Sequence, residues 1–247
     1  MMDRQEFLVH HGIKGMKWGV RKAPEVSGIG SSDRTINKGS EILYVSDRKY
    51  KEGKSKRLYS SYTKSDEATY TDLISSFGDN GRVYHNTFKV KSDLKVPSDK
   101  RAAEIFTKMA KEDPKSISED MAKAYQARVG LPLKTAKSFE KKISKLDSGN
   151  VALGEKLYSK YNKMLVADMT SSSNFYGRLA KEGYGALSDL NDRGKMAQDP
   201  LIIFNHDKKL SHVSSVPLSK KDVDSYIDYV MTREYKREKA DLSSVKR

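Results

Sequence analysis

The residues with the clearest chemical character lie together near the start of the chain, in the stretch HHGIKGMKWGVRK at residues 10–22. This stretch contains the one tryptophan of the sequence, three glycines and four Lys or Arg side chains. Glycine at this density disfavours helix and strand, because ordering each glycine costs backbone entropy. The pattern predicts a docking peptide in which Trp18 is the anchor, with Lys14, Lys17 and Arg21 facing an acidic or nucleic-acid surface. The alternative is that Trp18 packs onto the folded body as part of an N-terminal arm.

Familiar catalytic signatures are absent from the sequence. It has no P-loop, no dinucleotide-binding glycine fingerprint, no His-Glu-x-x-His and no Gly-x-Ser-x-Gly. The five histidines lack metal-ligand spacing, and the absence of cysteine rules out disulfides and a cysteine nucleophile. We therefore predict no metal site, and the lack of cysteine fits a reducing cytoplasm or the inside of a particle.

The charge balance limits the classes of partner. The 47 Lys and Arg against 33 Asp and Glu give a net charge of +14, which favours encounters with phosphate backbones and acidic proteins. Nucleic-acid binding is compatible with this charge but is not specifically indicated, because the lysines are spread along the chain without a recognition motif. No apolar run is long enough to span a bilayer, so we expect no membrane partner.

The elements that must position any site follow from the hydrophobic pattern. Short apolar or alternating runs predict strands at 41–45, 57–62, 82–90, 184–187 and 201–204. Stripes at helical spacing predict a helix ending near Phe77, a run of helices that fills 98–182, and a last helix capped by Ser219. This order predicts an α+β fold with a mixed β core, a helical insertion and a C-terminal helix.

The same pattern divides the chain into three parts. Residues 1–33 combine the basic Trp/Gly motif with a Ser- and Gly-containing connector, which is typical of a flexible arm. Residues 34–240 are predicted to form one α+β domain, and residues 241–247 a charged tail.

The N-terminal motif resembles a signature found near one end of many tailed-bacteriophage and prophage proteins of Gram-positive hosts. The match covers about a twentieth of the chain. The resemblance implies a phage context, a location in the virion or the host cytoplasm, and a phage structural protein or a host protein as partner. The residues expected to bind that partner are His10, Lys14, Met16, Lys17, Trp18 and Arg21.

The predicted strands carry a second resemblance, to the ADP-ribosyltransferase-like fold. The segment at 43–44 resembles the first strand of that fold, and residues 58–63 resemble a Ser- and Thr-rich strand that leads into a helix. Residues 183–187 and 199–205 resemble the closing strand pair of phage-encoded members. The order of these pieces along the chain carries the resemblance.

This resemblance implies NAD as cofactor and a site built from its matched positions. Cleaving the nicotinamide–ribose bond develops positive charge on the ribose, so a nearby carboxylate is required. The implied roles are acidic for Asp199, pocket-lining for Ser60 and Ser61, and cofactor contact for Arg48 and Tyr44. The sequence departs from the family pattern at 45–46, where Val and Ser stand in place of an arginine or histidine. It also lacks a glutamate at the usual spacing; the other acidic residues before the closing strand are Glu182, Asp189 and Asp192.

Two functions remain open from the sequence. One is a phage-encoded ADP-ribosyltransferase-like enzyme that is packaged or injected and modifies a host protein with NAD. The other is a non-enzymatic virion or accessory protein whose N-terminal motif docks a capsid or portal partner.

Overall fold

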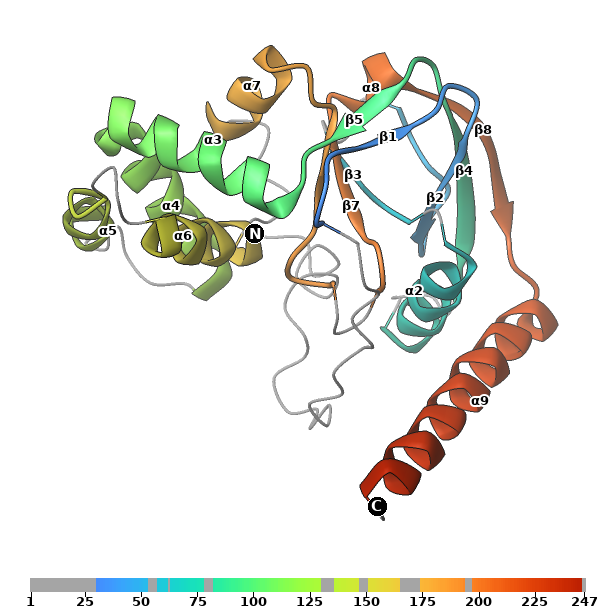
Figure 1. The fold of residues 1–247 in the computed structure, drawn as a ribbon. Coiled ribbons are helices and arrows are strands. Elements are labelled where there is room, and N and C mark those ends of the chain that lie inside the picture. The colour runs from blue at the N-terminus through green and yellow to red at the C-terminus, as the bar shows by residue number, and fades with distance from the viewer. Residues whose placement is uncertain are drawn as a thin grey trace.

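The computed structural model shows a β-rich half and a helical half (Figure 1). It describes residues 30–52, 57–61, 63–77, 82–129, 136–146, 151–164, 174–193 and 197–245. The predicted partner-binding residues of the N-terminal motif, from His10 to Arg21, lie outside the described residues. Among the described residues, the first strand begins at Arg34.

The strands pair in antiparallel register in three small sheets. One sheet has the order β2-β4-β8, a second β3-β7-β6, and a third β1-β5. Their bounds are β1 Arg34–Ile36, β2 Glu41–Ser46, β3 Arg57–Ser60, β4 Tyr84–Val90, β5 Leu94–Val96, β6 Ala186–Ser188, β7 Leu201–Phe204 and β8 Leu210–Pro217. The first two sheets meet where Leu43 and Ser61 exchange two backbone hydrogen bonds of 2.9 and 3.0 Å.

The helices fall into two groups. Helices α3 to α7 follow one another between β5 and β6 and form the helical half, on the left in Figure 1. Helices α2 and α9 pack against each other on the β side. The bounds are α2 Lys64–Phe77, α3 Asp99–Glu112, α4 Pro114–Val129, α5 Ala136–Ile143, α6 Val151–Met164, α7 Asn174–Lys181, α8 His206–Lys209 and α9 Lys220–Val245.

Strand β7 lies between the two hydrophobic cores and contributes side chains to both. Its side chains alternate, so that Ile202 and Phe204 join the core of the helical half. Leu201 and Ile203 join the core of the β half. A strand that is buried on both faces reads as a continuous apolar run, which explains why LIIF is the strongest strand signal in the sequence.

The predicted architecture is confirmed at the level of an α+β fold with a helical insertion. The helices lie within 98–182 as predicted, and the last helix follows Ser219, whose hydroxyl accepts from the Asp222 backbone N–H (3.2 Å). The pattern missed β8 and the short pair β1–β5. Helix α9 continues to Val245, so the predicted domain boundary at residue 240 falls inside a helix.

Candidate functional site

Strand β3 brings together three of the residues predicted to line a site. Ser60 pairs with Leu201 of β7, and Ser61 lies opposite Leu43 of β2, next to Tyr44. The end of β3 therefore lies between the first predicted strand and the closing strand pair. The segments that carry the ADP-ribosyltransferase resemblance are thus consecutive neighbours in space, in the order β2, β3, β7 and β6.

The two serine hydroxyls at this point are buried. Ser60 is 4% exposed and Ser61 is 1% exposed, and neither Oγ atom has a hydrogen-bond partner among the described residues. A buried hydroxyl without a partner is unfavourable by about 1–3 kcal/mol. These hydroxyls are therefore polar groups with spare hydrogen-bonding capacity at the meeting point of two sheets.

Asp199 is held in a different environment. The Arg34 guanidinium donates to both of its carboxylate oxygens, and the Asp199 side chain is only 2% exposed. The backbone N–H groups of Gln198 and Asp199 donate to the carboxylate of Asp66, at 2.6 and 2.8 Å. We call Arg34, Asp66 and Asp199 the buried junction. It ties β1, the first turn of α2 and the segment before β7 together.

The buried junction changes the pKa of one of its carboxyl groups, that of Asp66. Burial raises the pKa of Asp66, and this outweighs the two backbone N–H groups that favour its charged form. The negative charge of Asp199 adds to the rise in the pKa of Asp66. The charge of Asp199 itself is matched by the bidentate contact from Arg34, the arrangement in which an arginine holds a carboxylate best.

The remaining acidic residues near the closing strand pair also have intramolecular partners. Asp189 and Asp192 are buried, and the Tyr70 hydroxyl donates to Asp192 at 3.0 Å. Burial together with the nearby Asp192 raises the pKa of Tyr70 well above its usual value. Asn191 donates through its side chain to Asp192 and through its backbone N–H to Asp189, at 3.0 and 2.8 Å.

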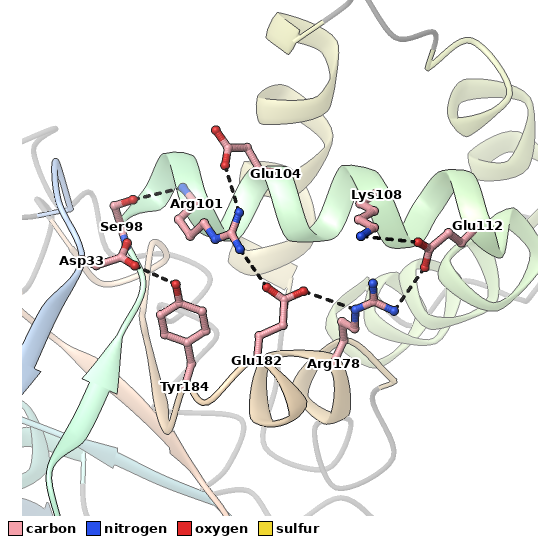
Figure 2. A network of polar contacts seen from close by, with 9 residues as sticks. All are labelled: Asp33, Ser98, Arg101, Glu104, Lys108, Glu112, Arg178, Glu182 and Tyr184. Carbon is pink, nitrogen blue, oxygen red and sulfur yellow. Dashed lines mark hydrogen bonds and ion pairs between the residues drawn. The ribbon is translucent and has the colours of Figure 1, made fainter.

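Glu182 lies on the surface of the helical half (Figure 2). It bridges Arg101 at 3.0 Å and Arg178 at 3.3 Å. Arg178 also contacts Glu112 at 3.2 Å. Arg101, Glu112, Arg178 and Glu182, which link α3 to α7, are called the surface network below.

Arg48 does not lie with the other predicted site residues. Because β2 runs antiparallel to β3 from the Leu43 bridge, the residues after Ser46 lie toward the start of β3. Asp199 precedes Leu201 in the antiparallel β7 register and lies beyond the other end of β3. Strand β2 ends at Ser46, whose hydroxyl donates to the Arg48 carbonyl oxygen at 2.6 Å, so Arg48 lies in the bend that follows the strand. Arg48 is exposed and its guanidinium is 3.7 Å from Asp47.

A cavity of 490 Å³ opens in a third place, between the start of α3, α6 and the segment at 190–193. Its lining includes the ion pair of Asp99 and Arg193, and none of the predicted site residues. Gly30 at its edge has a φ of +82°, and a Cβ there would lie 2.5 Å from a guanidinium nitrogen of Arg193. The positive φ favours glycine at this position, whereas the guanidinium is the end of a flexible side chain and can move.

The sequence missed Arg34 and assigned no role to Asp66 and Tyr70. Asp66 and Tyr70 are one turn apart on α2 and share one helix face. This spacing could have indicated that the two polar side chains meet buried partners. Arg34 gave no signal, because its partner lies 165 positions further along the chain.

The described residues contain no group of three or more His, Cys, Asp or Glu side chains placed to hold a metal ion. The same residues include no helix with the length and apolar character needed to cross a membrane. As for NAD, the buried hydroxyls of Ser60 and Ser61, which have no partner among the described residues, offer hydrogen-bonding capacity to a polar group. Asp199 does not fit the acidic role, because it is buried and neutralised by Arg34.

Comparison with known proteins adds one finding. The model of a family of unknown function, DUF7211, matches residues 1–25, which contain the basic Trp/Gly motif. No curated protein and no solved structure matches the chain.

Proposed function

We propose that the chain is a non-enzymatic phage accessory or virion-associated protein that docks on a capsid or portal partner through its N-terminal motif. The observation that carries the proposal is the burial of Asp199 against Arg34. A carboxylate that must stabilise a developing positive charge has to face the reacting atoms. Asp199 faces an arginine of its own chain, which matches its charge.

The neighbouring carboxylates support the same conclusion. Asp189 and Asp192 are buried with Tyr70 and Asn191, and Glu182 is held between two arginines. Each of these acids contributes to the packing of the closing strand pair or the helical half. The body then serves as a folded scaffold in the virion or the host cytoplasm.

The N-terminal segment supplies the docking function in this proposal. Its tryptophan and basic flanks are the residue types that anchor a protein interface. The family match is confined to this end of the chain, which supports a role for the segment separate from that of the body.

Particle incorporation tests the docking proposal. The full-length chain and its Trp18→Ala variant would be produced during phage growth, and purified particles analysed by quantitative mass spectrometry. Removing an anchoring aromatic side chain costs about 2 kcal/mol or more of binding free energy. We therefore expect a fall of about thirtyfold in the amount of particle-bound protein. Ser32→Ala, in the connector outside the motif, is the matched control and should leave incorporation unchanged. Equal incorporation of the Trp18→Ala variant and the wild type would refute the proposal.

One observation favours the second function, NAD-dependent ADP-ribosyl transfer to a host protein. Among the residues that the structure describes, the hydroxyls of Ser60 and Ser61 have no hydrogen-bond partner, and they lie where the segments that resemble that fold meet. Incubating the protein with labelled NAD and host lysate separates the two functions. Our proposal predicts no label transfer and no change in melting temperature with NAD. Label transfer that is lost on Ser61→Val would establish the enzymatic function instead.

A further inference from the structure

Helices α5 and α6 carry a concentrated set of exposed lysines. The described residues 136–146 and 151–164 contain seven lysines and two glutamates, a net charge of +5 in 25 residues. The whole chain of 247 residues carries +14. About a third of the net charge therefore lies in a tenth of the chain, although lysines are common everywhere in the sequence.

The helical spacing places these lysines in two outward stripes. On α5, Phe139 and Ile143 are buried against the rest of the helical half, so Lys137 and Lys141 point away from it. Lys145, in the turn that follows α5, extends this stripe by a further four positions. All three lysines are exposed.

On α6 the stripe consists of Lys156, Lys160 and Lys163, at positions i, i+4 and i+7. The opposite face of α6, with Leu157 and Tyr161, is buried. The Lys160 ammonium lies 5.4 Å from the centre of the Phe139 ring, which is on the buried face of α5, so the α6 stripe comes close to α5 while Lys137 and Lys141 face outward from the same helix. The six residues Lys137, Lys141, Lys145, Lys156, Lys160 and Lys163 are called the lysine surface.

We propose that the lysine surface binds the phosphate backbone of a nucleic acid without sequence preference. This partner is separate from the one proposed for the N-terminal motif. Lysines four residues apart on a helix present ammonium groups at a repeat of roughly 6 Å. A polymer with regularly spaced phosphates contacts several of them at once and releases counterions as it does so.

The chemistry of the surface favours nucleic acid over the other polyanions in a cell. Binding to a membrane surface needs apolar side chains beside the lysines, and Phe139, Ile143 and Leu146 are buried in the core. A protein partner would be anchored by exposed aromatic or arginine side chains. The described residues 136–146 and 151–164 contain no arginine, and their aromatic residues are buried.

A DNA-binding titration tests this proposal. The full chain would be titrated into a fluorescent 24-base-pair DNA duplex of arbitrary sequence at several salt concentrations. Four to six phosphate contacts predict that log K falls against log salt with a slope between about −3.6 and −5.4. The variant K137Q/K141Q/K145Q/K156Q should bind at least tenfold more weakly at 100 mM salt, with a slope about 3 units shallower. These four side chains are exposed, so the variant should keep the wild-type circular dichroism spectrum.

The matched control removes the same charge from the other half of the molecule. The variant K38Q/K51Q/K89Q/K220Q also loses four exposed lysines, and it should weaken DNA binding less than threefold. Equal weakening by both variants would mean that net charge alone acts and would overturn the proposal. Three other results would overturn the proposal. These are no binding to DNA, binding to poly-glutamate as tight as to DNA, and binding only to phosphatidylserine vesicles.

Discussion

The buried junction and the surface network use the same residue types in opposite environments. In the junction, Arg34 holds Asp199, whose side chain is 2% exposed. In the network, the Glu182 side chain is 24% exposed and lies between Arg101 and Arg178, whose side chains are 46% and 30% exposed (Figure 2). Removing one partner of a buried ion pair leaves an uncompensated charge, whereas an exposed pair contributes about 0–1 kcal/mol.

This difference teaches that residue type and spacing alone do not identify a functional carboxylate here. Glu182 and Asp199 both precede or flank the closing strand pair, and both bind arginine. Burial separates them, because it makes Asp199 part of the folded structure and leaves Glu182 at the surface. Substitutions ordered from the junction to the network should therefore have decreasing effects on stability.

The largest effect is expected at Asp66. The substitution Asp66→Ala removes the acceptor of two buried backbone N–H groups, those of Gln198 and Asp199. Each unsatisfied N–H costs about 1–3 kcal/mol, so we expect a loss of roughly 3–5 kcal/mol in the free energy of unfolding, measured by urea denaturation. Asp66→Asn keeps one acceptor oxygen for one of these N–H groups and should lose about half as much. A loss below about 1 kcal/mol for Asp66→Ala would show that the junction does not hold the fold.

Asp120 is a buried carboxylate that differs from Asp199 in its partner, which is a backbone N–H group and not an arginine. The Asn174 N–H donates to it at 3.1 Å, and burial raises the pKa of Asp120 to about 6. Since the folded protein binds this proton more tightly than the unfolded chain, the carboxylate destabilises the fold above pH 6, and this contribution disappears toward pH 4. Asp120→Asn should therefore stabilise the protein by roughly 1–3 kcal/mol at pH 8 and by almost nothing near pH 4.

Denaturant melts of the Asp120→Asn variant at several pH values measure this dependence. The exposed neighbour Glu119 provides the control, since Glu119→Gln removes the same charge and should change stability by less than about 0.5 kcal/mol. A gain from Asp120→Asn that does not vary with pH would contradict the role assigned to its ionisation.

A substitution at a half-buried contact should lower the free energy of unfolding by an intermediate amount, between the effects in the junction and in the network. The Tyr226 hydroxyl of α9 donates to Glu67 of α2 at 2.7 Å, and Glu67 also lies 3.2 Å from His85. Thermal melts of Tyr226→Phe should show a loss of about 1.5–3 kcal/mol, because the substitution removes one hydrogen bond to a charged group. Tyr229→Phe, on the exposed part of the same helix, should be neutral in the same thermal melts. Equal effects of the two substitutions would mean that the Glu67 contact adds nothing.

The smallest effect is expected in the surface network. Arg101→Gln breaks the contact with Glu182, and both side chains are solvent-accessible. We expect a loss of less than about 1 kcal/mol at low salt, which falls further at 1 M salt because exposed pairs are screened. Urea denaturation at the two salt concentrations measures both values. A loss of several kcal/mol would remove the distinction between the network and the junction.

The sequence predicted the architecture better than the environment of single residues. The α+β order and the helices within 98–182 follow from local periodicity, which survives folding. Strand β8 was missed because half of its sequence, LSHVSSVP, is polar, as is common for a strand at the edge of a sheet. The pairing of Asp199 with Arg34 joins positions 165 residues apart, and no local pattern encodes it.

The central claim is that Asp199 is a structural carboxylate held by Arg34, and a double-mutant cycle between these two residues tests it most directly. The variants Arg34→Met, Asp199→Leu and the double substitution would be compared with the wild type by urea denaturation. Arg34→Met leaves the buried Asp199 carboxylate without its partner, so we expect a loss of about 3–5 kcal/mol, whereas Asp199→Leu leaves an arginine whose side chain is 22% exposed and should cost less. The double variant should be closer to wild type than Arg34→Met. A coupling energy of about 3 kcal/mol would support the claim. A coupling energy below about 0.5 kcal/mol would contradict it and return Asp199 to the set of candidate catalytic residues.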